Sequence, residues 1–580
     1  MKAKAARKRR AAAPPEAAAH RRERRSYLLA GAALAAALLA AFWAYGPALH
    51  GPFLFDDTVL PFSLSAASAP LLAWMRGVRP LLMASYWLNT RISGDDPFSY
   101  HVFNLVIHVA AAVLIFLIVR RLLEWSQAPA ARRTLLAGFA GGLFLLHPMQ
   151  TEAVAYVAGR SEALSVMLVL AAYAVFLYRR KAAIGWGTVV LVAALFGAAV
   201  LSKEQTIMLP ALLLLTDLWW NPGFSWRGAR DNWRLYAPLA LGAAAAVAFY
   251  WKQILYSPSA GFSLRGVSWY QYLFTQGRAL LVYPAEFLLP VRLTADWDFP
   301  FSRTAFDHGA IFGLAALVAL AAAAWHYRRR FSLACFGFLA YLVLMAPTSS
   351  ILPIADPLAE RRLYLGMLGL LVMAVDLLAR IRVDTRKLTA ALAAVLLAAT
   401  LATHARAAVW SDPIALWQDT ATKSPHKRRV LFQLASAYAD AGRCQDAVEE
   451  YQKVAQEWPP NYDMLIDWGL AYDCVNQPDL ALEKLRQAAS MEPTAHVYSQ
   501  IAKVYAERRR WAEALDALAM AEKLDPSFAT TYAYRGKILF NLNRAAEAVA
   551  DYQRALALQP SLADVVRPDL AAAEARLAGH

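Results

Sequence analysis

The sequence predicts an all-helical membrane protein that continues into a soluble helical repeat. Three observations lead to this prediction. Of the 580 residues, 59% are hydrophobic and only 18% are charged, which is too apolar for one soluble globule. Long apolar runs alternate with clusters of Lys and Arg up to about residue 405. Beyond residue 428, small residues and prolines recur every 33 or 34 residues.

The net charge of +16 belongs to the apolar part of the chain. Residues 1–405 hold 39 Lys or Arg and 20 Asp or Glu, whereas the remaining residues hold 20 and 23. Membrane topology explains a basic excess beside apolar segments better than nucleic acid does, so we expect no nucleic-acid partner. Three cysteines cannot form a disulfide framework, and neither a CxxC nor an HExxH pattern occurs.

Residues 1–26 are predicted to form a basic cytoplasmic tail, because the first 25 residues carry ten Lys or Arg against two Glu. The apolar run 27–49 follows directly. It is longer than the core of a cleaved signal peptide, about 7 to 15 residues, and matches the roughly 20 residues that span a bilayer. We interpret it as a signal anchor whose N-terminus faces the cytoplasm.

Ten further apolar runs bring the predicted total to about eleven spans, in a membrane domain of residues 27–405. Counting alternately from an inside N-terminus places five basic clusters on the cytoplasmic side, as the positive-inside rule requires. The apolar stretch 270–289 would invert this order if it crossed, so we expect an amphipathic or re-entrant segment within the outer loop 255–308. The ten runs are 102–119, 134–147, 162–178, 183–201, 205–220, 236–254, 309–326, 331–346, 363–379 and 388–404. The clusters are Arg120/Arg121/Arg132/Arg133, Arg179/Arg180/Lys181, Arg227/Arg230/Arg234, Arg328/Arg329/Arg330 and Arg380/Arg382/Arg386/Lys387.

Residues 428–580 are predicted to form about four tetratricopeptide repeats and a capping helix, after a linker of residues 406–427. Three series of residues recur with spacings of 34, 33 and 34: Ala435, Gly469, Ala502, Gly536; Ala447, Ala481, Ala514, Ala548; and Pro459, Pro493, Pro526, Pro560. This is the period of the tetratricopeptide helix pair, in which small residues lie where the helices touch and Pro follows the second helix. Cys444 and Cys474 lie in adjacent repeats and either form a disulfide or remain free thiols.

Polar residues gather at the predicted outer ends of the spans, where such groups are costly and usually functional. His101, Asn104 and His108 share one helical face, because they are spaced by three and seven residues. The full set is Asp56, Asp57 and Arg79 in the outer loop 50–101; His101, Asn104 and His108 in the second span; His147, Glu152 and Arg160 after the third; Lys203 after the fifth; and Glu360 and Arg361 before the tenth.

Paired carboxylates ringed by Arg, Lys and His suit a reaction between a lipid-linked phosphate and a hydroxyl. The cations would hold phosphate oxygens and stabilise the leaving group, and an Asp would accept the acceptor's proton. Each group also has a plain structural interpretation. Asp56-Asp57 can mark a solvated loop, the polar face of the second span can join helices, and Lys203 can pair locally with Glu204. The recurrence of such groups at one membrane face favours catalysis.

The chain resembles, over nearly its whole length, the transmembrane and tetratricopeptide-repeat-containing protein O-mannosyltransferase family of the GT-C class. The resemblance rests on Phe55-Asp56-Asp57, Arg79-Pro80-Leu81, Tyr100-His101 through Asn104 to His108, His147-Pro148 with Thr151-Glu152-Ala153-Val154 and Gly159-Arg160, Ser202-Lys203-Glu204-Gln205, and Ala359-Glu360-Arg361 with Leu363-Tyr364-Leu365.

This resemblance implies an inverting transferase that moves mannose or a similar hexose from a polyprenyl-phosphate donor to Ser or Thr hydroxyls of exported proteins, with the repeats binding the acceptor. It implies that Asp56 or Asp57 is the base, without choosing between them. The residues implied toward the donor phosphate are Arg361, Lys203, Arg160 and His147. The supporting residues are Glu360, Glu152, His101, Asn104, His108 and Arg79.

No cofactor is expected beyond the lipid-linked donor, and a divalent metal is left open because no complete ligand set is evident. We expect a bacterial inner-membrane protein with periplasmic repeats, or lumenal repeats in the endoplasmic reticulum of a eukaryote. Two other functions fit: a GT-C transferase with a lipid or glycan acceptor, and a non-enzymatic scaffold for envelope assembly. A scaffold should tolerate loss of the carboxylates but not of residues 410–580, whereas a transferase should lose turnover with the carboxylates.

Overall fold

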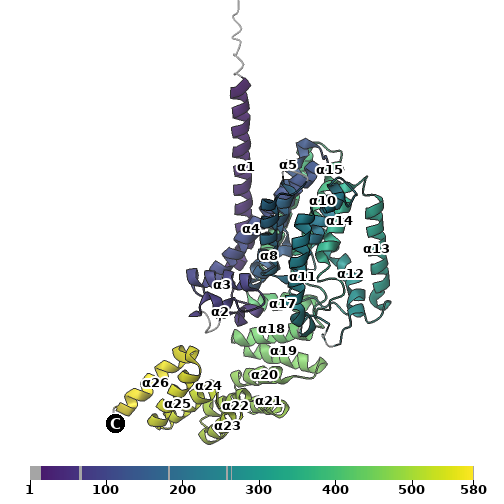
Figure 1. Ribbon diagram of the computed structural model, residues 1–580. Coiled ribbons are helices and arrows are strands. Elements are labelled where there is room, and N and C mark those ends of the chain that lie inside the picture. The colour runs from purple at the N-terminus through teal and green to yellow at the C-terminus, as the bar shows by residue number, and fades with distance from the viewer. Residues whose placement is uncertain are drawn as a thin grey trace, which may run out of the picture.

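Each predicted apolar run coincides with a helix in the computed structural model of the chain (Figure 1). The structure describes residues 15–63, 68–179, 183–256, 259–262, 264 and 266–578. Residues 1–14 of the predicted basic tail, and Arg180 and Lys181 of one predicted cluster, lie outside the described residues. The helices are α1 (Pro15–Tyr45), α4 (Pro97–Trp125), α5 (Ala130–Leu146), α7 (Arg160–Leu177), α8 (Trp186–Val200), α9 (Leu209–Trp220), α11 (Trp233–Tyr256), α13 (Ala310–His326), α14 (Ser332–Met345), α15 (Leu363–Arg380) and α16 (Thr385–Val409).

Six segments of the described residues are long and apolar enough to cross a membrane, so the chain is a membrane protein. They are Gly31–His50, Pro97–Trp125, Val157–Leu177, Asp307–His326, Glu360–Arg380 and Thr385–Val409. The helices α8 and α14 are apolar but shorter. The all-helical class is confirmed, whereas the figure of eleven crossings stays a prediction.

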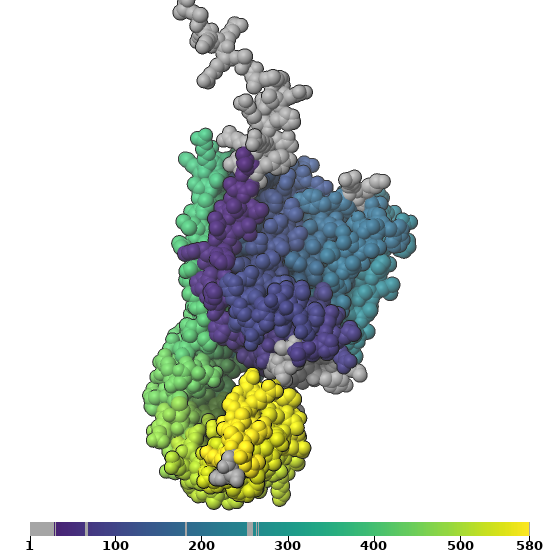
Figure 2. Space-filling model, turned by 90° about the vertical axis from the view of Figure 1, so that its left-hand side faces the viewer, coloured from purple at the N-terminus to yellow at the C-terminus, as the bar shows by residue number. Residues whose placement is uncertain are grey.

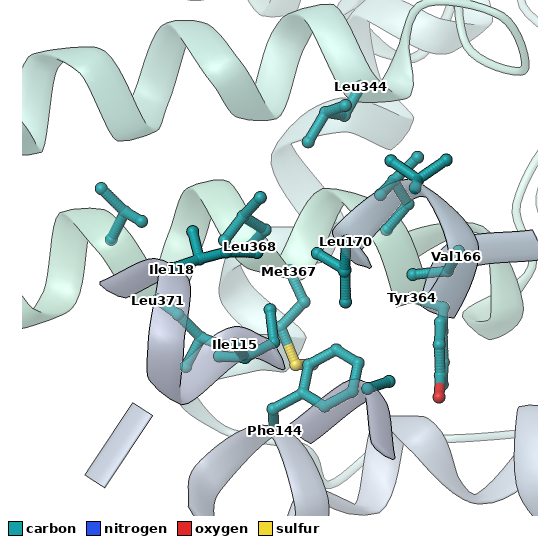
Figure 3. Packing of buried hydrophobic residues seen from close by; sticks show 14 of the residues in the cluster. Ile115, Ile118, Phe144, Val166, Leu170, Leu344, Tyr364, Met367, Leu368 and Leu371 are labelled. Atoms are coloured by element: carbon teal, nitrogen blue, oxygen red, sulfur yellow. The ribbon is translucent and has the colours of Figure 1, made fainter. Parts of the chain in front are cut away.

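The core of the bundle lies where α4, α5, α7, α14 and α15 meet. Figure 3 shows the side chains that converge there: Ile115 and Ile118 of α4, Phe144 of α5, Val166 and Leu170 of α7, Leu344 of α14, and Tyr364, Met367, Leu368 and Leu371 of α15. Gly337 and Gly369 let α14 and α15 approach closely, because a Cβ atom on Gly337 would lie 2.6 Å from the carbonyl oxygen of Gly369. Small residues at such crossings are typical of membrane helix packing.

The two ends of the bundle carry different segments. One end, called here the repeat-side end, carries the loop 46–101 with α2 (Leu71–Trp74) and α3 (Pro80–Ser93), and it faces the repeats (Figure 1). The other end carries the predicted clusters around Arg132 and Arg380. There Arg132 donates to the carbonyl oxygens of Ile381, at 2.7 Å, and of Val383. Two clusters far apart in sequence are thus adjacent in space.

The stretch predicted not to cross forms α12 (Trp269–Leu288), which is not among the six candidate spans of the described chain. Its side chains bond with loops of the repeat-side end. Gln276 donates to the carbonyl of Pro357 at 2.8 Å, and Arg278 to that of Pro300 at 3.0 Å. That this segment belongs to the outer loop 255–308 stays a prediction.

Beyond the bundle, four helix pairs and a last helix form a curved stack, the repeat domain. In both overall views the stack curves so that α26 lies below the loop region of the bundle (Figures 1 and 2). The helices are α18 (Arg428–Asp440), α19 (Cys444–Glu457), α20 (Tyr462–Cys474), α21 (Pro478–Met491), α22 (Ala495–Glu507), α23 (Trp511–Leu524), α24 (Ala529–Asn541), α25 (Ala545–Leu558) and α26 (Ala563–Ala578).

The recurring small residues lie where paired helices touch, as their spacing predicts. Ala435 and Ala502 are fully buried. A Cβ atom on Gly469 would lie 2.9 Å from the side chain of Leu485, and one on Gly536 equally close to a neighbouring Tyr ring. Larger residues at these positions would push the two helices of a repeat apart.

Cys444 and Cys474, which the sequence left open, are joined by a disulfide with their Cα atoms 6.0 Å apart. The bond links α19 of the first helix pair to α20 of the second. Disulfides of this kind persist in oxidising compartments.

The segment 406–427 differs from the linker that the sequence predicts. It contains α17 (Pro413–Lys423), whose Leu416 and Trp417 are buried. Trp417 belongs to the same apolar cluster as Val430 and Leu434 of α18. The helix is short and its apolar face holds few residues, so composition alone does not reveal it. It precedes the four helix pairs and shares their apolar cluster, so we count it as the first helix of the stack, and it also packs against the bundle.

Candidate active site

The acidic pair lies in a short 3-10 helix, η2 (Phe55–Val59), and its two carboxylates have different surroundings. Asp57 is 1% exposed, and its Oδ1 and Oδ2 accept the backbone N–H groups of Ala158, at 2.7 Å, and Leu54, at 3.1 Å. Asp56 is exposed, and its backbone N–H donates to the hydroxyl of Tyr156 at 3.0 Å. Only the Asp56 carboxylate is therefore open to a substrate.

Burial raises the pKa of Asp57 to about 7, and the charge of Asp56 adds to this effect. The backbone N–H groups of Leu54, Ala158 and Val157 act in the opposite direction. Asp57 thus belongs to the framework of the loop rather than to its surface, because both its carboxylate oxygens serve backbone donors.

The polar face of α4 joins three segments of the repeat-side end. Asp96 caps the helix by accepting the N–H of Phe98, and Pro97 stands at the first helical position. His101, Asn104 and His108 are all buried, and each bonds to a different part of the chain. His101 bonds to the carbonyl oxygen of Gly51 at 3.2 Å. Asn104 donates to the carbonyl oxygens of Tyr156, at 3.1 Å, and Val157, at 3.3 Å. His108 bonds to the carbonyl oxygen of Leu145 at 3.1 Å. His101 and Asn104 thus hold the segments that lead to Asp56 and contain Tyr156, whereas His108 joins α4 to the end of α5.

Arg160 is fully buried, and protein groups engage every nitrogen of its guanidinium. Its partners are Asn104 Oδ1, at 2.8 Å, Asn89 Oδ1, at 2.7 Å, and the carbonyl oxygens of Tyr100, at 3.1 Å, and Ser85, at 3.3 Å. The rings of Tyr86 and Phe103 each lie 4.5 Å from its central carbon. The structure therefore does not place Arg160 where a donor phosphate could reach it, contrary to the expectation from its motif.

His147 is also enclosed by the protein. Its Nδ1 accepts the N–H of Met149 at 3.2 Å, so Nε2 carries the proton that is donated to the carbonyl of Phe287 at 3.0 Å. With both ring nitrogens engaged, His147 fixes the end of α5 against α12. It is not placed to bind a phosphate.

Three ion pairs lie at the repeat-side end, and in two of them the cation is the more exposed partner. The side chain of Arg361 is 34% exposed and that of Glu152 is 3% exposed, whereas the values for Lys203 and Glu162 are 12% and 2%. Arg361 donates to the carboxylate of Glu152 from both its guanidinium and its backbone N–H, the latter at 2.9 Å. The buried carboxylates hold these two cations, and the side chain of Arg361 is the more exposed of the two.

Arg79 forms the third pair, with two bonds of 3.0 and 2.7 Å to Glu204. Glu162 lies within electrostatic range of both Arg79 and Arg361, so the three pairs form one neighbourhood. Burial disfavours the charged form of Lys203 and lowers its pKa, while Glu162 acts in the opposite direction. This neighbourhood can supply donors to an anion from three separate segments of the chain.

Glu360 precedes Arg361 in sequence but bonds to other parts of the chain. It is 1% exposed, accepts the N–H of Thr294 and lies 3.9 Å from Arg406 of α16. It therefore joins the loop 289–309 to α16. Within the described ranges, no group of three or more His, Cys, Asp or Glu side chains is arranged to hold a metal ion.

Two residues that the sequence did not single out contact the segment that carries the acidic pair. Tyr156 bonds to the backbone of Asp56, and the ring of Trp417 lies 4.9 Å from that of Phe55. Tyr156 lies between the motif residues Glu152 and Arg160, so the sequence could have indicated it as a candidate. Trp417 lies about 360 residues downstream of Asp56, and only the folded chain brings the two segments together.

The chain matches curated proteins along most of its length. It is 23% identical to the mouse protein O-mannosyl-transferase TMTC3 over 555 residues, 84% of this chain and 58% of that protein. It is 23% identical to human TMTC1 over 502 residues, 73% of this chain and 55% of that protein. It is 39% identical to Drosophila melanogaster Tmtc1 over 141 residues, 24% of this chain and 15% of that protein. The chain is thus similar to the Tmtc proteins over most of its own length.

The chain spans a little over half the length of the mammalian Tmtc proteins it matches. Two tetratricopeptide-repeat family profiles match residues 429–461 and 529–562, which include most of the first and last helix pairs. Among solved structures, the repeats resemble MamA (21% identity, TM-score 0.23, 26% of this chain and 89% of that one). They also resemble a thermophilic repeat protein of Thermus thermophilus (22% identity, TM-score 0.26, 31% of this chain and 94% of that one).

Proposed function

We propose that the protein is an inverting glycosyltransferase that moves a hexose from a polyprenyl-phosphate donor to a Ser or Thr hydroxyl of an exported protein. The observation behind the proposal is the exposed carboxylate of Asp56, which lies at the same end of the bundle as the cations Arg361, Lys203 and Arg79. The names of the Tmtc relatives, which are protein O-mannosyl-transferases, support the same reaction class.

In this mechanism Asp56 is the general base. The acceptor oxygen attacks the anomeric carbon as its proton passes to the Asp56 carboxylate, and the bond from that carbon to the phosphate oxygen breaks on the opposite face. The bonding electrons leave with the polyprenyl phosphate, whose growing negative charge Arg361 stabilises, with Lys203 and Arg79 beside it. Tyr156 and Asp57 hold the loop that presents Asp56.

The proposed orientation places the repeat-side end outside the cytoplasm. Three observations support it: the predicted clusters around Arg132 and Arg380 lie at the other end, the candidate site and the repeats share one end, and the first repeats carry a disulfide. The compartment would be a bacterial periplasm, or the endoplasmic reticulum lumen in a eukaryote. The curved repeats would hold the acceptor polypeptide near Asp56, which raises its local concentration.

A groove between α8 and α11 supports a lipid-linked donor. It has a volume of about 410 Å³ and is lined by apolar or small residues, among them Gly197, Gly242 and Tyr250. The hydroxyl of Tyr250 donates to the carbonyl of Val78, which directly precedes Arg79, at 2.8 Å. An isoprenoid tail in this groove would therefore bring its phosphate to the cations.

Gly197→Leu is expected to raise the KM for a long-chain polyprenyl-phosphate hexose about tenfold, because the new side chain occupies the groove. A Cβ atom on Gly197 meets nothing within 4 Å, so the new side chain starts in open space. Gly187→Leu is the matched control, since Gly187 is exposed on the same helix, equally free of neighbours, and outside the groove. Initial rates with long-chain and short-chain donors measure the effect. Equal KM values for the two variants would argue against a donor tail in this groove.

Mass spectrometry of envelope proteins tests the function as a whole. Cells that carry the wild type, a deletion or Asp56→Asn would be compared, and we expect a hexose on Ser or Thr that only the wild type adds. If the proteins stay unchanged while lipid-linked glycans differ, the acceptor is a lipid or glycan. If neither changes, the protein is a scaffold and the proposal is wrong.

A further inference from the structure

We propose that the first helix of the repeat stack, α17, positions the segment 54–59 that carries Asp56, and that Trp417 is the positioning residue. The proposal rests on the proposed function only in treating Asp56 as the base. Its consequence is that the repeat domain is part of the active site's framework, rather than a separate module that only binds the acceptor.

Phe55, directly before Asp56, connects the two parts of the chain. Its ring lies 4.9 Å from that of Trp417, 5.4 Å from that of Tyr156 and 6.2 Å from that of Trp410. Trp417 is only 5% exposed and belongs to the apolar core of the repeats. Phe55 thus packs its side chain against the core of another domain.

The backbone of Phe55 shows why this packing matters. Its φ angle of 49° lies in the left-handed region, which an aromatic residue rarely adopts because it is strained there. Such a conformation persists only when its surroundings impose it. Tyr156 holds the next backbone N–H from the bundle, and Trp417 holds the Phe55 ring from the repeats. Without Trp417, the segment loses the contact that comes from the repeat side.

The helix α17 is itself fixed to both partners. Gln418 donates to the hydroxyl of Tyr438 in α18 at 2.7 Å, which ties the helix to the repeats. Asp419 accepts from Arg406 of α16 at 2.6 Å, and Lys423 donates to the carbonyl of Leu293 at 2.7 Å, which ties it to the bundle. A shift of the repeats therefore reaches Trp417 directly.

A second set of ion pairs sets the angle of the stack on the bundle. Arg429 donates to Asp296 at 2.7 Å and to Asp356 at 2.8 Å, and Lys427 forms ion pairs with both carboxylates. These contacts lie at the start of α18, beside α17. Binding of a polypeptide to the repeats can thus change the position of Asp56 through α17.

Trp417→Ala in the full-length protein, reconstituted in liposomes, tests the proposal. We expect kcat to fall about 10- to 100-fold, as a misplaced catalytic group predicts, with the KM for the polyprenyl-phosphate hexose unchanged. Trp417→Phe, which keeps a ring beside Phe55, should recover most of the rate. Hydrogen exchange followed by mass spectrometry should show faster exchange across residues 54–59 in the Ala variant alone.

Trp468→Ala is the matched control, because Trp468 is buried in the same core but its ring partners are Tyr472 and Lys484. Equal loss of kcat in the two Ala variants, or unchanged exchange across residues 54–59 in Trp417→Ala, would overturn the proposal. If the wild type transfers no hexose, the proposed function fails, and the exchange measurement alone still decides whether α17 positions this segment.

Discussion

Asp56→Asn is expected to lower kcat by about 10²- to 10⁴-fold, the usual contribution of a positioned general base. The reason is that Asp56 is the exposed member of the pair, and the amide of Asn cannot accept the acceptor's proton. The KM for the donor should change little, since the carboxylate makes no contact with the cations that would hold the phosphate. Initial rates in liposomes measure both constants.

Two controls separate this effect from damage to the loop. Asp95→Asn makes the same change at an exposed position of the loop 50–101 and should leave kcat unchanged. Asp57→Asn should speed hydrogen exchange across residues 54–59, because Asn can accept only one of the two backbone N–H bonds that Asp57 accepts. An Asp56→Asn enzyme that keeps wild-type kcat would show that another group is the base.

Arg361→Met should lower kcat by about 10²- to 10³-fold, comparable to the loss of one donor to a developing oxyanion. Arg361 is the most exposed cation of the three ion pairs. Its loss also leaves the buried carboxylate of Glu152 without its cation, which costs stability. The double variant Arg361→Met with Glu152→Gln removes that second effect, so kcat of the double variant measures the loss of the phosphate contact.

Arg76→Met serves as the control for this prediction, because Arg76 is an exposed cation three residues before Arg79 at the same end of the bundle. It should leave kcat within about twofold of the wild type. If the double variant keeps wild-type kcat, or loses no more than Arg76→Met does, then Arg361 does not stabilise the leaving phosphate.

Much of the fold could be predicted because its signals are local. A long apolar run forms a helix whichever other helix it packs against. The spacing of Ala435, Gly469, Ala502 and Gly536 indicates where the two helices of each pair are in contact. The segment 406–427 was mistaken for a linker because α17 has only 11 residues and one narrow apolar face. Its burial depends on the bundle and the repeats together, which no local pattern encodes.

The site was predictable as a set of residues but not as a set of roles. The motifs indicated Asp56, Asp57, Arg160 and Arg361 as candidates, without showing which of them are exposed. Which carboxylate faces outward depends on the turn of η2 and on the N–H groups of Leu54 and Ala158. Arg160 is enclosed by residues from several other segments, so its burial is a tertiary property.

The most direct test of the account is transfer by the purified protein in liposomes, with a radiolabelled polyprenyl-phosphate hexose and a Ser/Thr peptide. The measurement follows peptide-bound label and released polyprenyl phosphate together, for the wild type and for Asp56→Asn. We expect equal amounts of the two products from the wild type and almost none from the variant. Equal transfer by both proteins, or release of polyprenyl phosphate without labelled peptide, would contradict the account.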